Sequence, residues 1–147
     1  MFEKYTDKAR RVIFYARYEA SEFGTQSIET EHILLGLLRE EEMLTDLLTR
    51  SHTTVESIKK RIAEHFAIRE KIPTSVDLPL SKASKRVLGY AVEEMLQRGD
   101  KRLATGHLLA GMLREESSFA AGLLMEHGVE LDAVRKGIAM PPGEPGA

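Results

Sequence analysis

The sequence predicts an all-α fold in which two similar four-helix repeats pack together as one eight-helix domain. The first observation is an internal duplication: residues 5–41 align with residues 80–116 without a gap and share 14 identities in 37 positions. Composition alone would give roughly two or three identities. The second observation is that apolar residues recur at spacings of three and four, and no segment alternates convincingly with period two. The 147 residues, 42% of them hydrophobic, suffice for one shared core.

The first repeat contains signals for four helices. Thr6 can act as the N-cap of the first helix, and Gly24 can end it. Thr30 is the expected N-cap of the second helix, which is apolar on nearly all sides and therefore suits the centre of the repeat. A short third helix follows. The fourth is expected to begin at a capping box formed by Thr53 and Glu56, where hydroxyl and carboxylate satisfy free backbone donors.

The second repeat follows the same plan. Its helices are expected at four places: from Ser81 to about Gln97, from Thr105, near 120–125, and from Leu131. The prolines near both ends of the segment between the copies favour a linker, because helices rarely continue across proline. The predicted organisation is therefore a first repeat at 1–69, a linker at 70–79, a second repeat at 80–140 and a flexible tail at 141–147.

Several classes of protein are disfavoured by composition and by missing motifs. The absence of cysteine excludes disulfides, thiolate metal sites and cysteine nucleophiles. No secretory signal or membrane-length apolar run is present, so we expect a cytoplasmic protein without a membrane partner. The motifs of P-loop ATPases, HExxH metalloproteases and GxSxG hydrolases are all missing. We therefore expect no enzymatic activity and no cofactor.

Two histidines occupy equivalent positions near helix starts. His32 and His107 each stand without a second histidine or cysteine, whereas zinc usually takes three or four protein ligands. We therefore expect both to be buried structural residues that bind no metal. A hydrolase using Glu31 and His32 is disfavoured, because adjacent residues on a helix point about 100 degrees apart.

Charged runs admit two interpretations. The acidic runs at 39–42 and 114–116 are expected to be solvated turns. A basic stripe could form from five residues: Lys59, Lys60, Arg61, Arg69 and Lys71. Glutamates interrupt it, which favours helix-surface ion pairs, and the net charge is only -2, so no nucleic-acid partner is expected. A helical regulator that binds nucleic acid through this stripe is the alternative function.

Two copies of one signature carry a resemblance to a known family. The signature reads T-E-H-I-L-L-G-L-L-R-E-E from Thr30 and T-G-H-L-L-A-G-M-L-R-E-E from Thr105, and Y-T-D-K-A-R-R-V precedes the first copy. The sequence resembles, over residues 2–140, the double Clp N-terminal domain of ClpC-type ATP-dependent chaperones. The resemblance implies a non-catalytic module whose partners are substrates, adaptor proteins or a Clp ATPase. No ATPase module is present here, which leaves a stand-alone protein and an excised domain as alternatives.

The resemblance also implies possible pockets for phosphorylated arginine. In ClpC-type members the motif glutamate holds the guanidinium, while a hydroxyl and a basic group at the start of the repeat's first helix hold the phosphate. In the first repeat these roles fall to Thr6, Arg10 and Glu31. In the second repeat Ser81 and Lys85 fit the phosphate side, but Gly106 replaces the glutamate. A guanidinium there would lose a charge-assisted partner, so a weaker second pocket is expected.

Overall fold

A computed structural model, which describes residues 2–139, confirms the all-α fold. The first repeat contains α1 (Asp7–Phe23), α2 (Thr30–Glu40), α3 (Glu42–Arg50) and α4 (Val55–His65). The second contains α5 (Lys82–Arg98), α6 (Thr105–Arg114), α7 (Phe119–Glu126) and α8 (Leu131–Gly137). The predicted tail at 141–147 lies outside the described residues.

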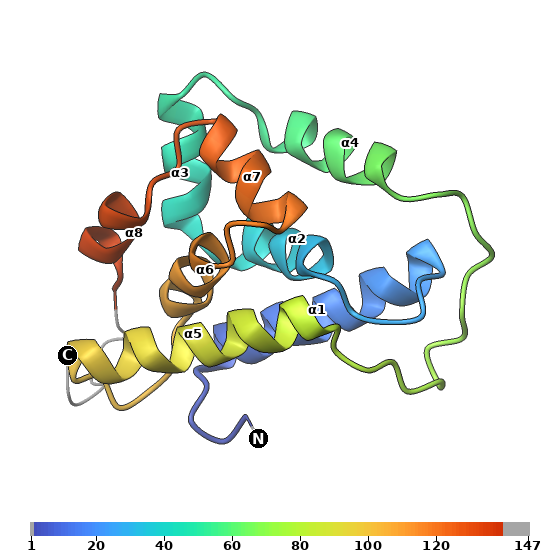
Figure 1. Ribbon diagram of the computed structural model, residues 1–147, viewed down its shortest axis with the longest axis horizontal. Helices are drawn as coiled ribbons and strands as arrows, with labels where there is room; N and C mark the ends of the chain where they lie inside the picture. Colours follow the sequence, from blue (N-terminus) through green and yellow to red (C-terminus); the bar gives the residue numbers. More distant parts are fainter. Residues whose placement is uncertain (1, 140–147) are drawn as a thin grey trace.

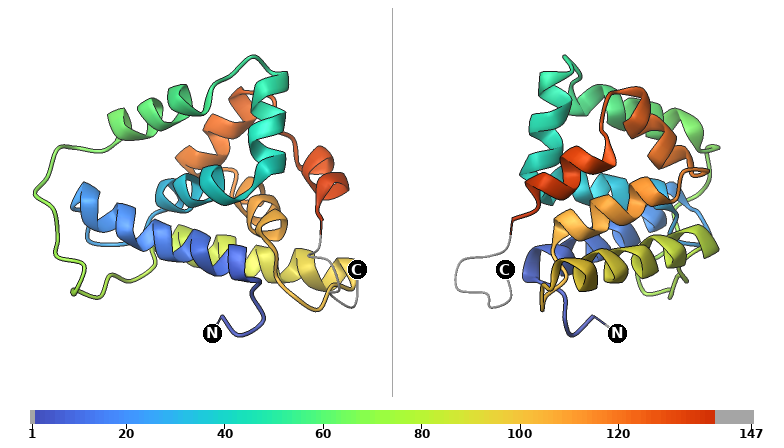
Figure 2. Two further views of the ribbon diagram at one scale, coloured as in Figure 1. Left: turned by 180° about the vertical axis from the view of Figure 1, so that it is seen from behind. Right: turned by 60° about the vertical axis from the view of Figure 1, so that its left-hand side comes forward.

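The helices are arranged around a central pair, α2 and α6 (Figures 1 and 2). The long helices α1 and α5 lie on one side of this pair, and the shorter helices lie on the other. Large apolar side chains of the central pair are fully buried, and they include Ile33, Leu34, Leu37, Leu108, Leu109 and Met112. The prediction of a central, all-round apolar second helix is therefore confirmed for both repeats.

Two glycines allow each long helix to pack closely on its central partner. A Cβ atom added at Gly36 of α2 would lie 2.5 Å from the carbonyl oxygen of Val12 in α1. A Cβ added at Gly111 of α6 would lie 2.5 Å from the carbonyl oxygen of Val87 in α5. The glycines thus permit backbone contact that any side chain would prevent, although glycine lowers helix propensity.

The two repeats exchange short backbone pairings. Tyr5 forms an isolated parallel bridge with Leu103, and Ile28 forms the equivalent bridge with Leu80. In the first bridge the Thr6 amide donates to the Leu103 carbonyl at 2.9 Å. As a result, the start of each long helix lies against the segment that precedes the central helix of the other repeat.

The predicted ends of the long helices are confirmed. Thr6 caps α1 by accepting from the Ala9 amide, and Ser81 caps α5 in the same way. Gly24 and Gly99 end these helices in the left-handed conformation, with φ of 71° and 75°. Glycine adopts this conformation without the steric cost that a Cβ atom imposes.

Two predicted caps are wrong by one residue. The N-cap of α2 is Glu29, and Thr30 is the first helical residue, because the His32 imidazole accepts the Glu29 backbone N–H in the manner of a capping box. The N-cap of α4 is Thr54, whose hydroxyl accepts from the Ser57 amide at 3.1 Å. Thr53 instead donates its hydroxyl to the Ser51 carbonyl.

Candidate ligand-binding sites

The first predicted pocket is not assembled within one repeat. α1 and α2 run antiparallel: Arg11 near the start of α1 pairs with Glu40 at the end of α2, and the Phe23 ring lies 5.7 Å from that of His32. At about 1.5 Å per residue, Thr6 and Glu31 are therefore about 20 Å apart along the helix pair. The structure does not bring Thr6 and Arg10 together with Glu31.

Arg10 is engaged close to its own helix start. Its guanidinium donates to the Asp7 carboxylate at 2.9 Å and to the backbone carbonyls of Phe2 and Glu3 at 3.3 and 3.2 Å. These contacts bind the N-terminal segment to the first turn of α1.

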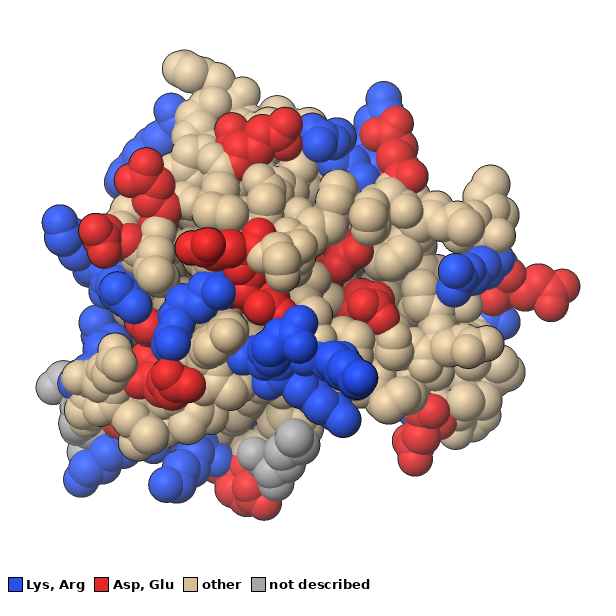
Figure 3. Space-filling model, in the orientation of Figure 1, with Lys and Arg blue, Asp and Glu red and all other residues tan. Residues whose placement is uncertain are grey.

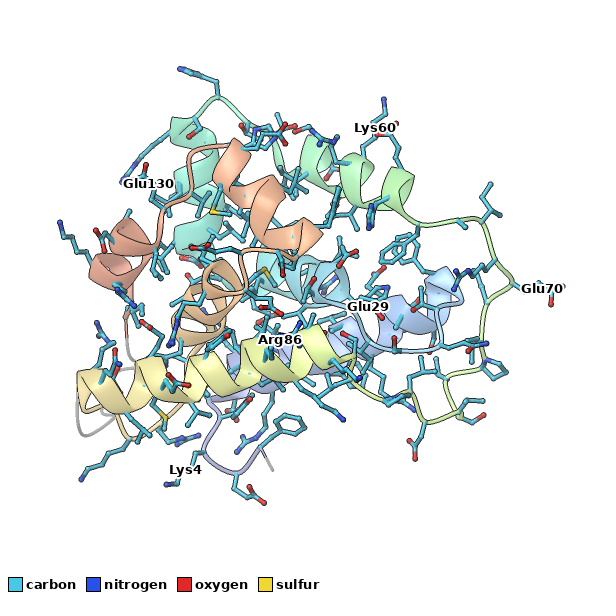
Figure 4. The ribbon with its side chains drawn as sticks, in the orientation of Figure 1. Lys4, Glu29, Lys60, Glu70, Arg86 and Glu130 are labelled. Atoms are coloured by element: carbon cyan, nitrogen blue, oxygen red, sulfur yellow. The ribbon has the colours of Figure 1, made fainter. Side chains whose placement is uncertain are left out.

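The start of α5 lies beside the segment that leads into α2. The Ser81 amide and the Ser84 hydroxyl both donate to the Ile28 carbonyl, at 3.0 and 2.8 Å. Ile28 precedes Glu31 by three residues, and Figure 4 shows Glu29 above the beginning of α5. Lys85 is exposed in the first turns of this helix. The structure thus places the segment that precedes Glu31 against the helix start that carries Ser81 and Lys85.

Glu31 is a buried carboxylate with two partners. Its exposed fraction is 7%; one oxygen accepts from the Thr30 hydroxyl at 2.7 Å, and the other lies 3.1 Å from Nε2 of His65. The His65 ring stacks on Phe119 of α7, with centroids 3.8 Å apart and an interplanar angle of 11°. Sequence reasoning missed both aromatic residues, since nothing in the spacing places the end of α4 beside the start of α7.

The equivalent location around Gly106 has a different construction. A Cβ atom there would lie 2.8 Å from Ile138 Cγ1, so Ile138, the residue after α8, fills the space of a side chain. The Thr105 hydroxyl, equivalent to that of Thr30, donates to Glu41 of the first repeat at 2.8 Å. A carboxylate from the other repeat therefore lies beside the position where the signature glutamate is missing.

The expectation that the acidic runs are solvated turns is wrong for Glu41 in the first run and Glu115 in the second, and Glu40 pairs with Arg11 of α1. The Glu41 carboxylate accepts from both the Thr105 hydroxyl and the Met43 amide, each at 2.8 Å. Glu115 is 6% exposed, and its carboxylate pairs with Arg86 of α5. Both carboxylates are therefore structural groups that join separate elements.

A cavity of about 610 Å³ opens beside Thr105. Residues of both repeats line it, and they include Thr6, Lys8, Glu41, Asp46, Arg102 and Thr105. Carboxylates predominate over cationic groups in this lining, and of the two helix starts predicted to bind phosphate, the start of α1 contributes to it. The two predicted phosphate-binding helix starts therefore face different surroundings.

The two motif histidines are buried, as predicted, with exposed fractions of 0%. In each, Nδ1 accepts a backbone N–H at 2.8 Å, so the proton of the neutral ring is carried by Nε2. Nε2 of His107 contacts the buried Asp100 carboxylate at 2.8 Å, whereas Nε2 of His32 has no polar partner among residues 2–139. Burial lowers the pKa of His32 to about 4 and also lowers the pKa of His107, where Asp100 opposes the effect.

Ion pairs break up the basic stripe that the alternative function requires, as the preferred interpretation of these charges expects. The stripe's paired members are Lys59 with Glu56 at 3.9 Å, Arg61 with Glu126 at 3.3 Å and Lys71 with Glu22 at 3.0 Å. Figure 3 shows acidic and basic side chains interspersed over the face that carries Lys60, which Figure 4 labels. This pattern is typical of a solvated protein surface rather than of a phosphate-binding stripe.

Two kinds of site are absent from the described part of the chain. Within residues 2–139 no group of three or more histidine and acidic side chains is arranged to hold a metal ion. In the same residues, no helix has both the length and the apolar character that a membrane span requires.

Comparison with known proteins identifies relatives along most of the chain. Residues 4–127 match the family model described as the Clp repeat (R) N-terminal domain. An ATP-dependent Clp protease ATP-binding subunit ClpA homolog from Porphyra purpurea is 33% identical over 144 residues, which are 98% of this chain and 18% of that relative. This chain thus spans less than a fifth of that relative's length.

Solved structures agree with this result. The N-terminal domain of the chaperone ClpD from Arabidopsis thaliana matches with a TM-score of 0.72 and 26% identity, covering 92% of this chain and 95% of that one. The ClpV N-domain, solved in complex with a VipB peptide, matches with a TM-score of 0.70 and 20% identity, covering 92% and 84%. The matched family model, together with these folds, shows that this chain belongs to the Clp repeat N-terminal domain family.

Proposed function

We propose that this chain is a non-catalytic protein-binding module of the Clp chaperone–protease system, acting in the cytoplasm by presenting substrates or adaptor proteins to a Clp ATPase. Membership of the Clp N-terminal family and the similarity to the ClpD N-terminal domain over 92% of this chain support this role. The ClpV N-domain, whose solved structure includes a VipB peptide, supports peptides as the class of partner.

The proposed ligand site combines Glu31 with the start of α5, and its ligand is the side chain of phosphorylated arginine. The observation that carries this assignment is the pairing of Ser81 and Ser84 with the Ile28 carbonyl, which places the α5 start beside the α2 start. A buried carboxylate can hold a guanidinium through charge-assisted hydrogen bonds. Free amides of a helix start and a nearby lysine, here Lys85, can hold the phosphate.

Thr6 and Arg10 belong to the second, weaker location in this proposal. Their helix start faces the segment around Gly106, where Glu41 supplies the carboxylate nearest to Thr105. Arg10 is also engaged by Asp7 and two carbonyls, which leaves its guanidinium less available to a phosphate. The ligand's two ends are thus assigned to different repeats, rather than to one repeat as in the grouping carried over from the family resemblance.

Calorimetry with free phosphoarginine tests the site. We expect one binding event, and Glu31→Gln and Lys85→Ala should each weaken it about 10-fold to 100-fold, because each removes a charge-assisted hydrogen bond. Glu64→Gln and Lys101→Ala are matched controls at exposed positions and should leave the affinity unchanged.

Arg10→Ala decides between the two groupings. Little change on Arg10→Ala supports the pairing between repeats. Loss of binding on Arg10→Ala with full binding by Lys85→Ala would restore the grouping within the first repeat. Absence of binding by the unmodified protein would refute the phosphoarginine site, and retention of a Clp ATPase or adaptor by the full chain would then still support the module.

A further inference from the structure

The imidazole of His65 fills the place beside Glu31 that the proposed ligand would need. Its Nε2 lies 3.1 Å from Glu31 Oε2, and its ring is stacked on Phe119 at 3.8 Å. Three elements meet here, because Glu31 lies in the first turn of α2, His65 ends α4 and Phe119 begins α7 of the other repeat. The His65 side chain of α4 therefore occupies the position beside the Glu31 carboxylate of α2.

A flat group held between a carboxylate and an aromatic face is the arrangement in which proteins bind a guanidinium. The guanidinium is planar, it pairs with carboxylates through parallel N–H donors, and it stacks on aromatic rings. The imidazole ring reproduces this arrangement with a smaller planar group and a single nitrogen directed at Glu31. Phe119 is thus positioned to serve as a stacking platform for either group.

The imidazole is also placed where it can leave. His65 is the last residue of α4, and its side chain is 41% exposed. The helix is held to the core by Ile58 and Ile62, which are fully buried. The His65 side chain can therefore rotate toward solvent while Ile58 and Ile62 stay buried.

We propose that His65 is an internal competitor that closes a guanidinium site built from Glu31 and Phe119. An arginine side chain enters by displacing the imidazole from the Phe119 ring and pairing with Glu31, while a phosphate on that arginine is directed to the α5 start. This inference rests on the proposed function, and it adds a platform residue and a gate to the same site. The apparent affinity then depends on the fraction of molecules in which His65 has left.

The test compares phosphoarginine binding by the full chain and by three single variants. His65→Ala should bind at least about fivefold more tightly, because the competitor is gone. Phe119→Leu should bind about threefold to tenfold more weakly, since the aromatic face is lost while apolar bulk remains. Lys60→Ala, an exposed change on the same helix, is the matched control and should bind as the unmodified chain does. Denaturant unfolding curves establish that each variant is folded.

Nuclear magnetic resonance of the His65 ring supplies a second readout in the unmodified chain. Bound phosphoarginine should remove the ring-current shift that Phe119 imposes on the His65 Cε1 proton. Binding of phosphoarginine by His65→Ala but not by the unmodified chain would also support the gate. Glu31-dependent binding with no effect of His65→Ala and no movement of the His65 resonance would overturn the gate and leave the proposed site intact. Absence of binding by both the unmodified chain and His65→Ala would overturn both the gate and the proposed site.

Discussion

Acid should destabilise this protein through His32, and the size of the effect follows from the burial of its ring. The imidazole is fully buried against the rings of Phe23 and Phe66, which also contact each other, and its Nδ1 already accepts the Glu29 amide. A proton on Nδ1 would remove that hydrogen bond and place a charge among apolar rings. The pKa of His32 is accordingly lowered from 6.5 to about 4.

The sign and magnitude follow from proton linkage. Because the folded-state pKa is below the unfolded-state value, the unfolded state binds more protons, and stability falls as the pH drops from about 6.5 towards 4. Each pKa unit is worth about 1.4 kcal/mol, so the complete effect is about 3 kcal/mol. At pH 5 about 2 kcal/mol of it should already be lost.

Urea unfolding of the unmodified protein and of His32→Asn, at pH 7.5 and pH 5, measures this term. Asparagine keeps an acceptor for the Glu29 amide but does not titrate. Carboxylates titrate in both proteins, so their contributions cancel in the difference between the two free energies of unfolding. The free energy of unfolding of the unmodified protein, relative to that of His32→Asn, should be about 2 kcal/mol lower at pH 5 than at pH 7.5. His52→Asn, at an exposed position, should leave the difference constant. The reasoning would be refuted if the difference in free energy of unfolding between the unmodified protein and His32→Asn changed by less than about 0.5 kcal/mol between the two pH values. Linkage would then assign His32 almost no pKa shift.

Three further predictions concern packing, buried charge and cooperativity. Gly111→Ala should destabilise the protein by about 1 to 3 kcal/mol in denaturant unfolding because its Cβ atom meets backbone, whereas Gly89→Ala, with open space around it, should stabilise by up to about 1 kcal/mol; equal effects would contradict this explanation. Glu94→Gln should lower the melting temperature, since the buried carboxylate loses charge-assisted bonds to two arginines at a cost of about 1.5 to 3 kcal/mol, and an unchanged melting temperature would count against it. Residues 1–72 and 73–147, expressed separately, should lack sharp melting transitions because α2 packs against α6 and α7, and two independently stable halves would disprove the shared core.

Much of the fold could be predicted from the sequence because helix formation depends on local patterns. Thr6 and Gly24 bound α1 as predicted, since a side-chain cap and a left-handed glycine act within a single turn. The one-residue errors at α2 and α4 arose where another residue competed for the capping role. At α2 the decisive group is the His32 imidazole, whose use as an acceptor for the Glu29 amide is visible only in the folded geometry.

The grouping of the site residues could not be predicted from the alignment of the repeats. The constant offset between the copies shows which positions are equivalent, but it does not show which positions are neighbours. The short connection between α1 and α2 was an available signal, because closely connected helices usually pack antiparallel and so separate Thr6 from Glu31. The contacts of His65 with Phe119 had no such signal, since they join two repeats through the ends of separate helices.

The bridges between Tyr5 and Leu103 and between Ile28 and Leu80 have the form of an isologous interface. Tyr5 is equivalent to Leu80 in the alignment of the copies, and Ile28 is equivalent to Leu103, so each copy offers the same two surfaces in exchange, as the subunits of a two-fold symmetric dimer do. Joining the copies in one chain makes this association intramolecular and therefore independent of protein concentration. In a dimer of identical subunits every substitution occurs twice. Here it occurs once, and the two ends of the pseudo-dimer have diverged, with Glu31 at one and Gly106 at the other.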